Sequence, residues 1–410
     1  MQPNLKTFCA ASWFQLRQQF DGTLRSCCEI KHNQTDFAGQ TQYTDIDEFL
    51  NSPYMAYVRH NLNTGNQIKE CDSCWVKEKS GVISLRNVLN NLIGYNQPYD
   101  KSWLPLYFKN KSDYYTTDVI FSADVKTNNL CNFSCAMCGP SDSSQIYALW
   151  QKHDTHPIVQ EVLANNPSML EDINLIYKEG RSYERLYKLL ARHPRHVKLL
   201  GGEPLLDEKL LTIVENYKNK NKTNLEFVTN GSKDLLSVYN RLSGYKHINF
   251  AVSLEGIGDV QDYVRRGSIW KQIESNIIKC ITMHPNSLHV STTMQALTLF
   301  HLPELIQWTH TNNIALSIAP LHYPLHHHLN SIPPDLMSKC LDKLAQCNYS
   351  IKNYISQDHV EDITISSLCA MIEDMYQFDS DAFSKLRTFL QWYDPADKWK
   401  SILPEWLPYL

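Results

Sequence analysis

The chain lacks any run of eighteen consecutive apolar residues, so the sequence predicts no segment that spans a membrane. It also lacks an excess of basic residues: its formal net charge is −4 at pH 7, whereas a protein that binds a nucleic-acid backbone is usually basic. The first residues lack the layout of a signal peptide, and no internal repeat is visible. We therefore expect a cytoplasmic protein with neither a membrane nor a nucleic acid as its partner.

Cysteine, by contrast, is plentiful, with twelve in 410 residues. Without a secretory signal these thiols are expected to stay reduced and to bind metal. Cys131, Cys135 and Cys138 have the spacing C-x3-C-x2-C. Three such thiolates can hold three irons of a [4Fe-4S] cluster and leave the fourth iron open to a small molecule. The alternative is a structural zinc site, which usually needs a second pair of ligands, and none lies nearby.

The middle of the chain alternates short apolar segments with helical patterns. Six segments have strand character: Val119–Ala123, Val197–Leu200, Leu225–Val228, Ile248–Val252, Leu288–Thr292 and Ile314–Ile318. Helical patterns follow the second to fifth of them: Leu206–Lys220, Lys233–Leu242, Ser268–Met283 and Leu302–Asn312. This alternation predicts an α/β fold with parallel strands and right-handed crossovers. Polar motifs after the strands should then meet at one face, where barrel enzymes place their active groups.

Several motifs follow these strands in order: Gly201-Gly202-Glu203-Pro204, Asn230-Gly231, Ser253 and Tyr263-Val-Arg265. Together with the three cysteines they resemble the radical S-adenosylmethionine (radical SAM) family over roughly residues 115–330. The resemblance implies a partial (β/α)6 TIM-like barrel. It also implies a SAM-binding [4Fe-4S] cluster on Cys131, Cys135 and Cys138, and reductive cleavage of S-adenosyl-L-methionine to a 5′-deoxyadenosyl radical.

The same resemblance implies which residues hold the cofactor. Gly201, Gly202 and Glu203 would contact the methionine amino group, and Asn230 lies in the turn after the third strand. Ser253 would reach the ribose and Arg265 the carboxylate. Family members often carry an aromatic residue before the third cysteine, but this chain has Met137, whose thioether can still pack on the flat adenine.

A second cysteine pattern precedes the barrel. Cys9, Gly22 and Cys27 are spaced C-x12-G-x4-C, with Cys28 next to Cys27, and Cys71-Asp-Ser-Cys74 follows. The first piece resembles the start of the SPASM and twitch auxiliary-cluster domains, in which the glycine permits a hairpin turn, here Phe20–Leu24. Four thiolates, from Cys9, Cys27, Cys71 and Cys74, would fill a second [4Fe-4S] cluster. Zinc on the same thiolates is the alternative, and Cys28 is a possible substitute for Cys27.

These patterns divide the chain into three parts. Residues 1–114 form the twitch-like module, 115–330 the barrel with a helical insertion at 141–190, and 331–410 a C-terminal helical segment. Residues 322–328 contain four histidines, which we interpret as a solvated polar loop rather than a metal or substrate site; they are His322, His326, His327 and His328. The sequence does not identify the catalytic acid or base.

The resemblance also implies a class of activity. Because twitch and SPASM relatives often act on peptides, the leading expectation is an enzyme that abstracts a hydrogen from a peptide or protein for post-translational modification. The alternative is an oxidoreductase or epimerase that acts on a small molecule such as a sugar or aminocyclitol. Either activity needs an electron donor such as flavodoxin or ferredoxin.

Overall fold

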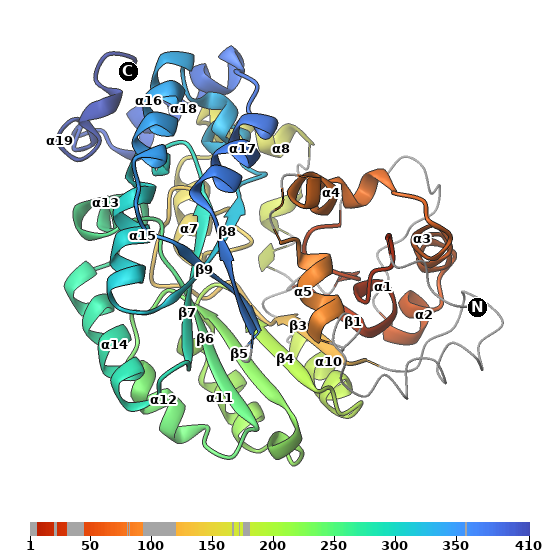
Figure 1. Ribbon diagram of the computed structural model, residues 1–410. Helices are drawn as coiled ribbons and strands as arrows, with labels where there is room; N and C mark the ends of the chain where they lie inside the picture. Colours follow the sequence, from red (N-terminus) through yellow and green to blue (C-terminus); the bar gives the residue numbers. More distant parts are fainter. Residues whose placement is uncertain are drawn as a thin grey trace.

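A computed structural model describes residues 6–19, 23–30, 45–79, 81, 83–92, 120–165, 168–171, 173–174, 181–356 and 359–410. Its centre is an eight-stranded sheet with the strand order β2-β1-β3-β4-β5-β6-β7-β8. The N-terminal module lies on the side of β1 and β3 (Figure 1). The C-terminal helices lie together above the strands in this view. Among the described residues, no helix combines the length and apolarity needed to cross a membrane.

Six strands form the predicted parallel barrel sheet. They are β3 (Ser122–Lys126), β4 (His196–Leu200), β5 (Asn224–Thr229), β6 (His247–Ser253), β7 (Leu288–Met294) and β8 (Ala315–Pro320). Each pairs in parallel with the next, as the alternation predicted. The first strand begins three residues later than the sequence indicated, and the others lie at or within one residue of their predicted starts.

Helices connect these strands and cover the apolar face of the sheet. In chain order they are α10 (Arg181–Leu190), α11 (Glu208–Glu215), α12 (Leu235–Arg241), α13 (Gly258–Val264), α14 (Trp270–Met283) and α15 (Leu302–Thr311). Val197 and Leu199 of β4 and Leu225 and Phe227 of β5 are at most 1% exposed, because alternate strand residues point into this helix-covered core.

The opposite face of the sheet is polar. Arg17, Asp124, Lys198, Glu226 and Asn249 are successive register partners across β1, β3, β4, β5 and β6. Their charges alternate, and Lys198 Nζ lies 2.7 Å from Glu226 Oε1. Burial alone would raise the pKa of Glu226, but Lys198 and His196 bring it well below its usual range. The barrel interior is therefore lined by compensated charges rather than by a second apolar core.

The sheet extends into the N-terminal module. β1 (Gln15–Gln18) pairs in parallel with β3, and β2 (Leu24–Arg25) pairs antiparallel with β1. This pairing agrees with the predicted hairpin, although its turn at residues 20–22 lies outside the described residues. The remaining elements of the module are α1 (Ala11–Phe14), α2 (Ile46–Leu50), α3 (Pro53–Thr64), α4 (Asp72–Lys79) and α5 (Leu85–Leu92).

The insertion and the C-terminal segment meet beyond the strands. The insertion contains α7 (Ser144–Lys152) and α8 (Pro157–Asn165), and the C-terminal segment contains α16 (Pro334–Ala345), α17 (Ile365–Met375), α18 (Ser380–Tyr393) and α19 (Trp399–Ile402). The C-terminal segment contains the predicted helices, but also two strands that the sequence did not indicate. β9 (Ile351–Ser356) and β10 (His359–Ile363) form a hairpin, and Tyr354 stacks on His289 of β7 at 3.8 Å between ring centroids.

Candidate active site

The loop with Cys131, Cys135 and Cys138 directly follows β3, and the backbone after α13 holds it in place. Ser134 N donates to Arg266 O at 2.9 Å, and Ala136 N donates to Val264 O at 2.8 Å. These bonds bring the loop next to Arg265, which is 130 positions away from Cys135 in the sequence. The predicted cluster ligands and the predicted SAM carboxylate ligand are thus neighbours.

Gly201 and Gly202 lie against the backbone that precedes the cysteine loop. A Cβ on Gly202 would lie 2.2 Å from Leu130 O, and one on Gly201 would lie 2.8 Å from Asn128 O. Gly202 N donates to Asn128 O at 3.1 Å, so the two segments are hydrogen-bonded as well as close. Only glycine fits at this approach. Both positions therefore require glycine, because the backbone that leads into the cysteine loop lies directly against them.

Glu203 is fully buried between the ends of β4 and β5. Its carboxylate accepts hydrogen bonds from Asn230 N at 2.6 Å, Thr229 Oγ1 at 2.8 Å and Leu205 N at 3.1 Å. Burial raises its pKa to about 6, even though these donors and Arg265 lower it. The side chain therefore orders the turn that carries Asn230. Any contact of this stretch with a SAM amino group remains a prediction.

Arg265 is held by a second buried carboxylate. Its Nη2 lies 2.7 Å from Glu255 Oε1, and the Glu255 side chain has no exposed area. Glu255 Oε2 accepts from Thr293 N at 2.8 Å, which fixes the pair to the end of β7. Arg265 Nη1 lies 4.0 Å from Cys135 Sγ, and its Nε is buried without a partner in the described residues. A cation with an unused donor thus lies beside the cysteines.

The other predicted cofactor residues are Asn230, which contacts the loop, Met137, which is part of it, and Ser253. Asn230 Nδ2 donates to Asn132 Oδ1 at 2.9 Å and lies 4.0 Å from Cys131 Sγ. Met137 is half-buried and packs against the main core. Ser253 ends β6, half-buried, opposite Ser291 of β7. The cysteine loop, Gly201–Pro204, Asn230 and Ser253 therefore all lie at the carboxyl ends of strands, as the alternating pattern predicted.

The three thiols have unequal environments. A hydrogen bond from Cys138 lowers the pKa of Cys135, and Arg265 acts in the same direction against the effect of burial. Burial raises the pKa of Cys131 to about 11. Metal ligation requires thiolates, so binding would release protons and exchange this burial cost for metal–sulfur bonds. Two buried thiols and one half-buried thiol on a single loop fit a metal group, and Arg265 would offset the negative charge of their thiolates.

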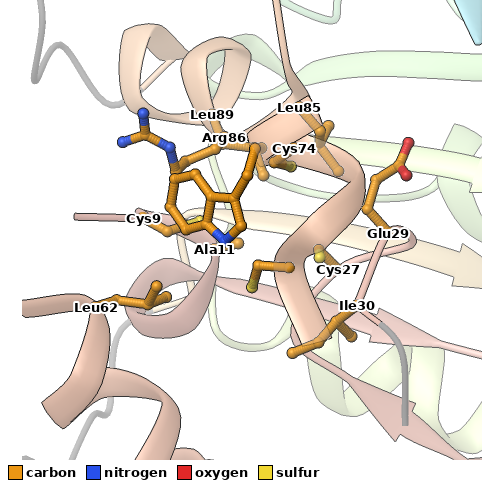
Figure 2. A pocket seen from close by; sticks show the side chains of 12 residues that line it. Cys9, Ala11, Cys27, Glu29, Ile30, Leu62, Cys74, Leu85, Arg86 and Leu89 are labelled. Atoms are coloured by element: carbon orange, nitrogen blue, oxygen red, sulfur yellow. The ribbon is translucent and has the colours of Figure 1, made fainter. Parts of the chain in front are cut away.

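The second cysteine set is also brought together. Cys9, Cys27, Cys71 and Cys74 line one cavity in the N-terminal module, with Arg86, Glu29, Trp75 and apolar side chains around them (Figure 2). The cavity contains about 330 Å³ of space not filled by protein atoms, part of it open to solvent. Cys28 is exposed and does not line it. Of the two adjacent cysteines, Cys27 is therefore the one placed with the other three.

Burial raises the pKa of all four of these thiols, that of Cys9 to about 12. Neighbouring thiols add to the effect at Cys9, Cys27 and Cys71. Four thiolates in one apolar cavity need a cation, so the donor set fits a metal centre. In the part of the chain that the structure describes, no group of three His, Cys, Asp or Glu side chains is placed so that it could hold a single metal ion. An iron–sulfur cube spreads its thiolates over four irons and does not require that placement.

The expectation of a solvated histidine loop is wrong for two of its residues. His326 is 8% exposed and His327 is 0% exposed, and both rings pack against Phe389 of α18 at 5.0 and 4.6 Å between centroids. Burial lowers the pKa of His326 to about 4 and that of His327 well below its usual value. His322 is exposed and lies 3.6 Å from Glu29 of the N-terminal module. The loop therefore joins three parts of the molecule.

Comparison with known proteins agrees with this geometry. A family model described as the radical SAM superfamily matches residues 125–309. The match supports a radical SAM domain in this part of the chain. Two relatives from Methanococcus maripaludis, each named probable GTP 3′,8-cyclase, share 30% identity over 147 residues (strain C6) and 28% over 148 residues (strain C7). Each match covers 34% of this chain and 48% of the relative, so the chain spans about half the length of these curated relatives.

One solved structure, of TYW1 with a lysine-pyruvate adduct bound, shares 16% identity with the chain at a TM-score of 0.34. That match covers 58% of this chain and 77% of the other.

Some residues that support the cysteine loop were not identified from the sequence as parts of the site. Tyr393, on α18, donates its hydroxyl to Ser134 O at 2.9 Å, and the Arg266 guanidinium lies over the Tyr393 ring at 3.7 Å. These contacts join the C-terminal helix to the cysteine loop. They link residues more than 120 positions apart, so no local pattern could have indicated them.

Proposed function

We propose that this chain is a radical SAM enzyme with two [4Fe-4S] clusters that acts on a small polar molecule bound inside the barrel. Cys131, Cys135 and Cys138 would hold the first cluster. With SAM bound and one electron delivered by a donor protein, that cluster would supply the reductive cleavage of SAM that enables hydrogen abstraction from an unactivated C–H bond. Cys9, Cys27, Cys71 and Cys74 would hold the auxiliary cluster. The observation that carries the proposal is the gathering of these four cysteines around one cavity in a chain that matches the radical SAM superfamily model.

The chain's own residues have separate tasks in this proposal. Glu255 orients Arg265 beside the cysteine loop, where its guanidinium would receive the SAM carboxylate. The glycines of the Gly201-Gly202 pair let the loop lie against the end of β4. Glu203 fixes the turn that carries Asn230. These contacts preorganise the site, because each side chain is buried or half-buried and has defined partners before any cofactor binds.

The barrel interior favours a small polar substrate. Lys198 is partly exposed there beside Glu226, and Ser253, Ser291 and Ser317 are successive half-buried register partners of β6, β7 and β8. Such hydroxyl and charged groups suit a substrate with hydroxyl, amide or phosphate groups. The relatives' name makes GTP the first candidate to assay. A peptide substrate, the leading expectation from the sequence, has no comparable support among the described contacts, and a flavodoxin or ferredoxin remains the proposed electron donor.

The cluster assignment is tested by anaerobic reconstitution of the full chain. We expect about eight irons in the wild type, from two four-iron clusters. Replacing Cys131, Cys135 and Cys138 with alanine should halve the iron and abolish 5′-deoxyadenosine formation after reduction with dithionite. Cys27→Ser should remove the auxiliary iron, whereas Cys28→Ser, the matched control at the adjacent position, should retain it. Zinc at either set of thiols would contradict the proposal.

The substrate class is tested on the same preparation. Reduced enzyme is incubated with SAM and one class of substrate at a time: nucleotides including GTP, sugars, or peptides. New products are then sought by mass spectrometry. We expect a product and coupled 5′-deoxyadenosine with a small polar molecule. A mass shift confined to a peptide would overturn the small-molecule assignment and restore the peptide hypothesis.

A further inference from the structure

We infer that Arg86 supplies the positive charge that sets the reduction potential of the auxiliary centre, and that Glu78 and Trp75 hold it for that purpose. The inference rests on the proposed four-cysteine cluster. Arg86 lines the same cavity as Cys9, Cys27, Cys71 and Cys74 (Figure 2). It is 7% exposed, so its charge is little screened by solvent.

The guanidinium is fixed on three sides. Its Nε donates to Glu78 Oε1 at 2.9 Å, and its Nη2 donates to Glu78 Oε2. Its Nη1 donates to Phe8 O at 2.8 Å, next to Cys9. Its Cζ lies 5.0 Å from the ring centroid of Trp75, which follows Cys74. These contacts join the segment of Cys9 to the helix of Cys74, so the cation belongs to the frame that holds the cysteines.

Three of the five guanidinium N–H groups are used in these bonds. The remaining two suit the sulfur atoms of a bound cluster. Glu78 is itself oriented by the hydroxyl of Ser84, which donates to its Oε1. Unlike Arg86, Glu78 does not line the cavity. Within this ion pair, the cation Arg86 therefore lies at the cavity of the cysteines, and the anion Glu78 does not.

The electrostatic consequence has a definite sign. A cluster on four thiolates gains negative charge when it takes up an electron, so a fixed cation nearby favours the reduced state. Net charge and hydrogen bonds to sulfur are known to set iron–sulfur potentials. Arginine remains protonated under all working conditions, so its effect does not vary with pH. Arg86 thereby makes the auxiliary centre a better electron acceptor, and Glu78 offsets part of the effect.

The test uses the full chain with Cys131, Cys135 and Cys138 replaced by alanine, so that only the auxiliary cluster contributes to the redox titration followed by electron paramagnetic resonance. Arg86→Met should lower the equilibrium constant for one-electron reduction about tenfold, a shift of about 59 mV to lower potential. Arg86→Lys should restore most of the loss. Glu78→Gln keeps the cation and removes its counter-charge, so the potential should rise.

Lys79→Gln is the matched control, because it removes one cation from α4, the helix of Cys74 and Glu78, but from a side chain that is 79% exposed. An Arg86→Met potential equal to that of Lys79→Gln, at full iron content, would overturn the role of Arg86 while leaving the cluster assignment intact. If Arg86→Met fails to assemble, Glu78→Gln decides: an unchanged or lower potential overturns the inference. Absence of iron from the parent protein would overturn the auxiliary cluster itself, and this inference with it.

Discussion

Gly202 is the residue at which the cysteine loop is most tightly constrained. A Cβ there would lie 2.2 Å from Leu130 O and 2.5 Å from both Asn129 O and Leu130 C, and all three are backbone atoms that cannot move aside. By contrast, a Cβ on Gly139, just after the third cysteine, would meet nothing closer than Asp142 Oδ2 at 3.5 Å. Gly202 is therefore required for steric reasons, whereas Gly139 lies close to the cysteines but has room for a Cβ.

We predict that Gly202→Ala displaces the cysteine loop. Overpacking of this kind costs about 1–3 kcal/mol or more, so the thermal midpoint of the metal-free protein should fall and reconstitution should yield less iron at the SAM site. Gly139→Ala is the control and should match the wild type in both measurements. Normal iron uptake by Gly202→Ala would show that the loop tolerates the shift.

The sequence identified most residues of the site but not all of their contacts. It indicated the cysteines, Glu203 and Arg265 because the order of their motifs along the chain resembles that of the radical SAM family. It attributed the two glycines to an approach to SAM, whereas their closest neighbours are the carbonyls of residues 128–130. It also did not indicate that Glu255 orients Arg265. These partners are remote in sequence, so no local spacing encodes them.

At the scale of elements, prediction succeeded where strands are apolar and alternate with helices. The barrel strands β3 to β8 satisfy both conditions. The hairpin that contains β1 was predicted, but the pairing of β1 with β3 was not, because the four residues of β1, Gln15–Gln18, are mostly polar. The β9–β10 hairpin was missed because helical patterns dominate the segment around it. β9 is stabilised in part by a tertiary contact, the stacking of Tyr354 on His289, which the sequence does not reveal.

Helix α18 provides a prediction at this scale, because its last residue supports the cysteine loop from outside the barrel. Tyr393→Phe removes the hydroxyl that donates to Ser134 O but keeps the ring under Arg266. We expect a loss of about 1 kcal/mol, measured by urea denaturation, and faster loss of SAM-site iron to a chelator. Tyr409→Phe, a change of the same kind in the half-buried C-terminal segment, serves as the control. Equal chelation rates in both variants would contradict a supporting role.

At the scale of the whole molecule, buried neutral histidines make stability depend on pH. Burial lowers the pKa of His289 from 6.5 to about 4, and Asn249 Nδ2 lies 3.0 Å from its Nδ1, where it donates to the unprotonated nitrogen. The folded-state pKa is below the unfolded one. Below pH 6.5 the unfolded chain therefore binds a proton that the folded chain does not, and stability falls as the pH drops toward 4.

We predict that His289→Gln reduces this acid sensitivity. Between pH 7.5 and pH 5.0 the wild-type histidine should account for a loss of up to about 2 kcal/mol in the free energy of unfolding. The variant should lack that part of the loss, whatever its absolute stability, when metal-free protein is unfolded in urea at both pH values. His310→Gln, at an exposed position of α15, is the comparison and should keep the wild-type difference. An equal pH difference in all three proteins would refute the assignment.

The pairing of β1 with β3 has a consequence for the order of folding. Residues 15–18 leave the ribosome long before their partners at 122–125, so this strand pair closes only after the intervening chain has been made. Cys9, Cys27, Cys71 and Cys74, however, are all translated within the first 74 residues. These four thiols can therefore meet during synthesis, and maturation of the proposed auxiliary centre need not wait for the barrel to close.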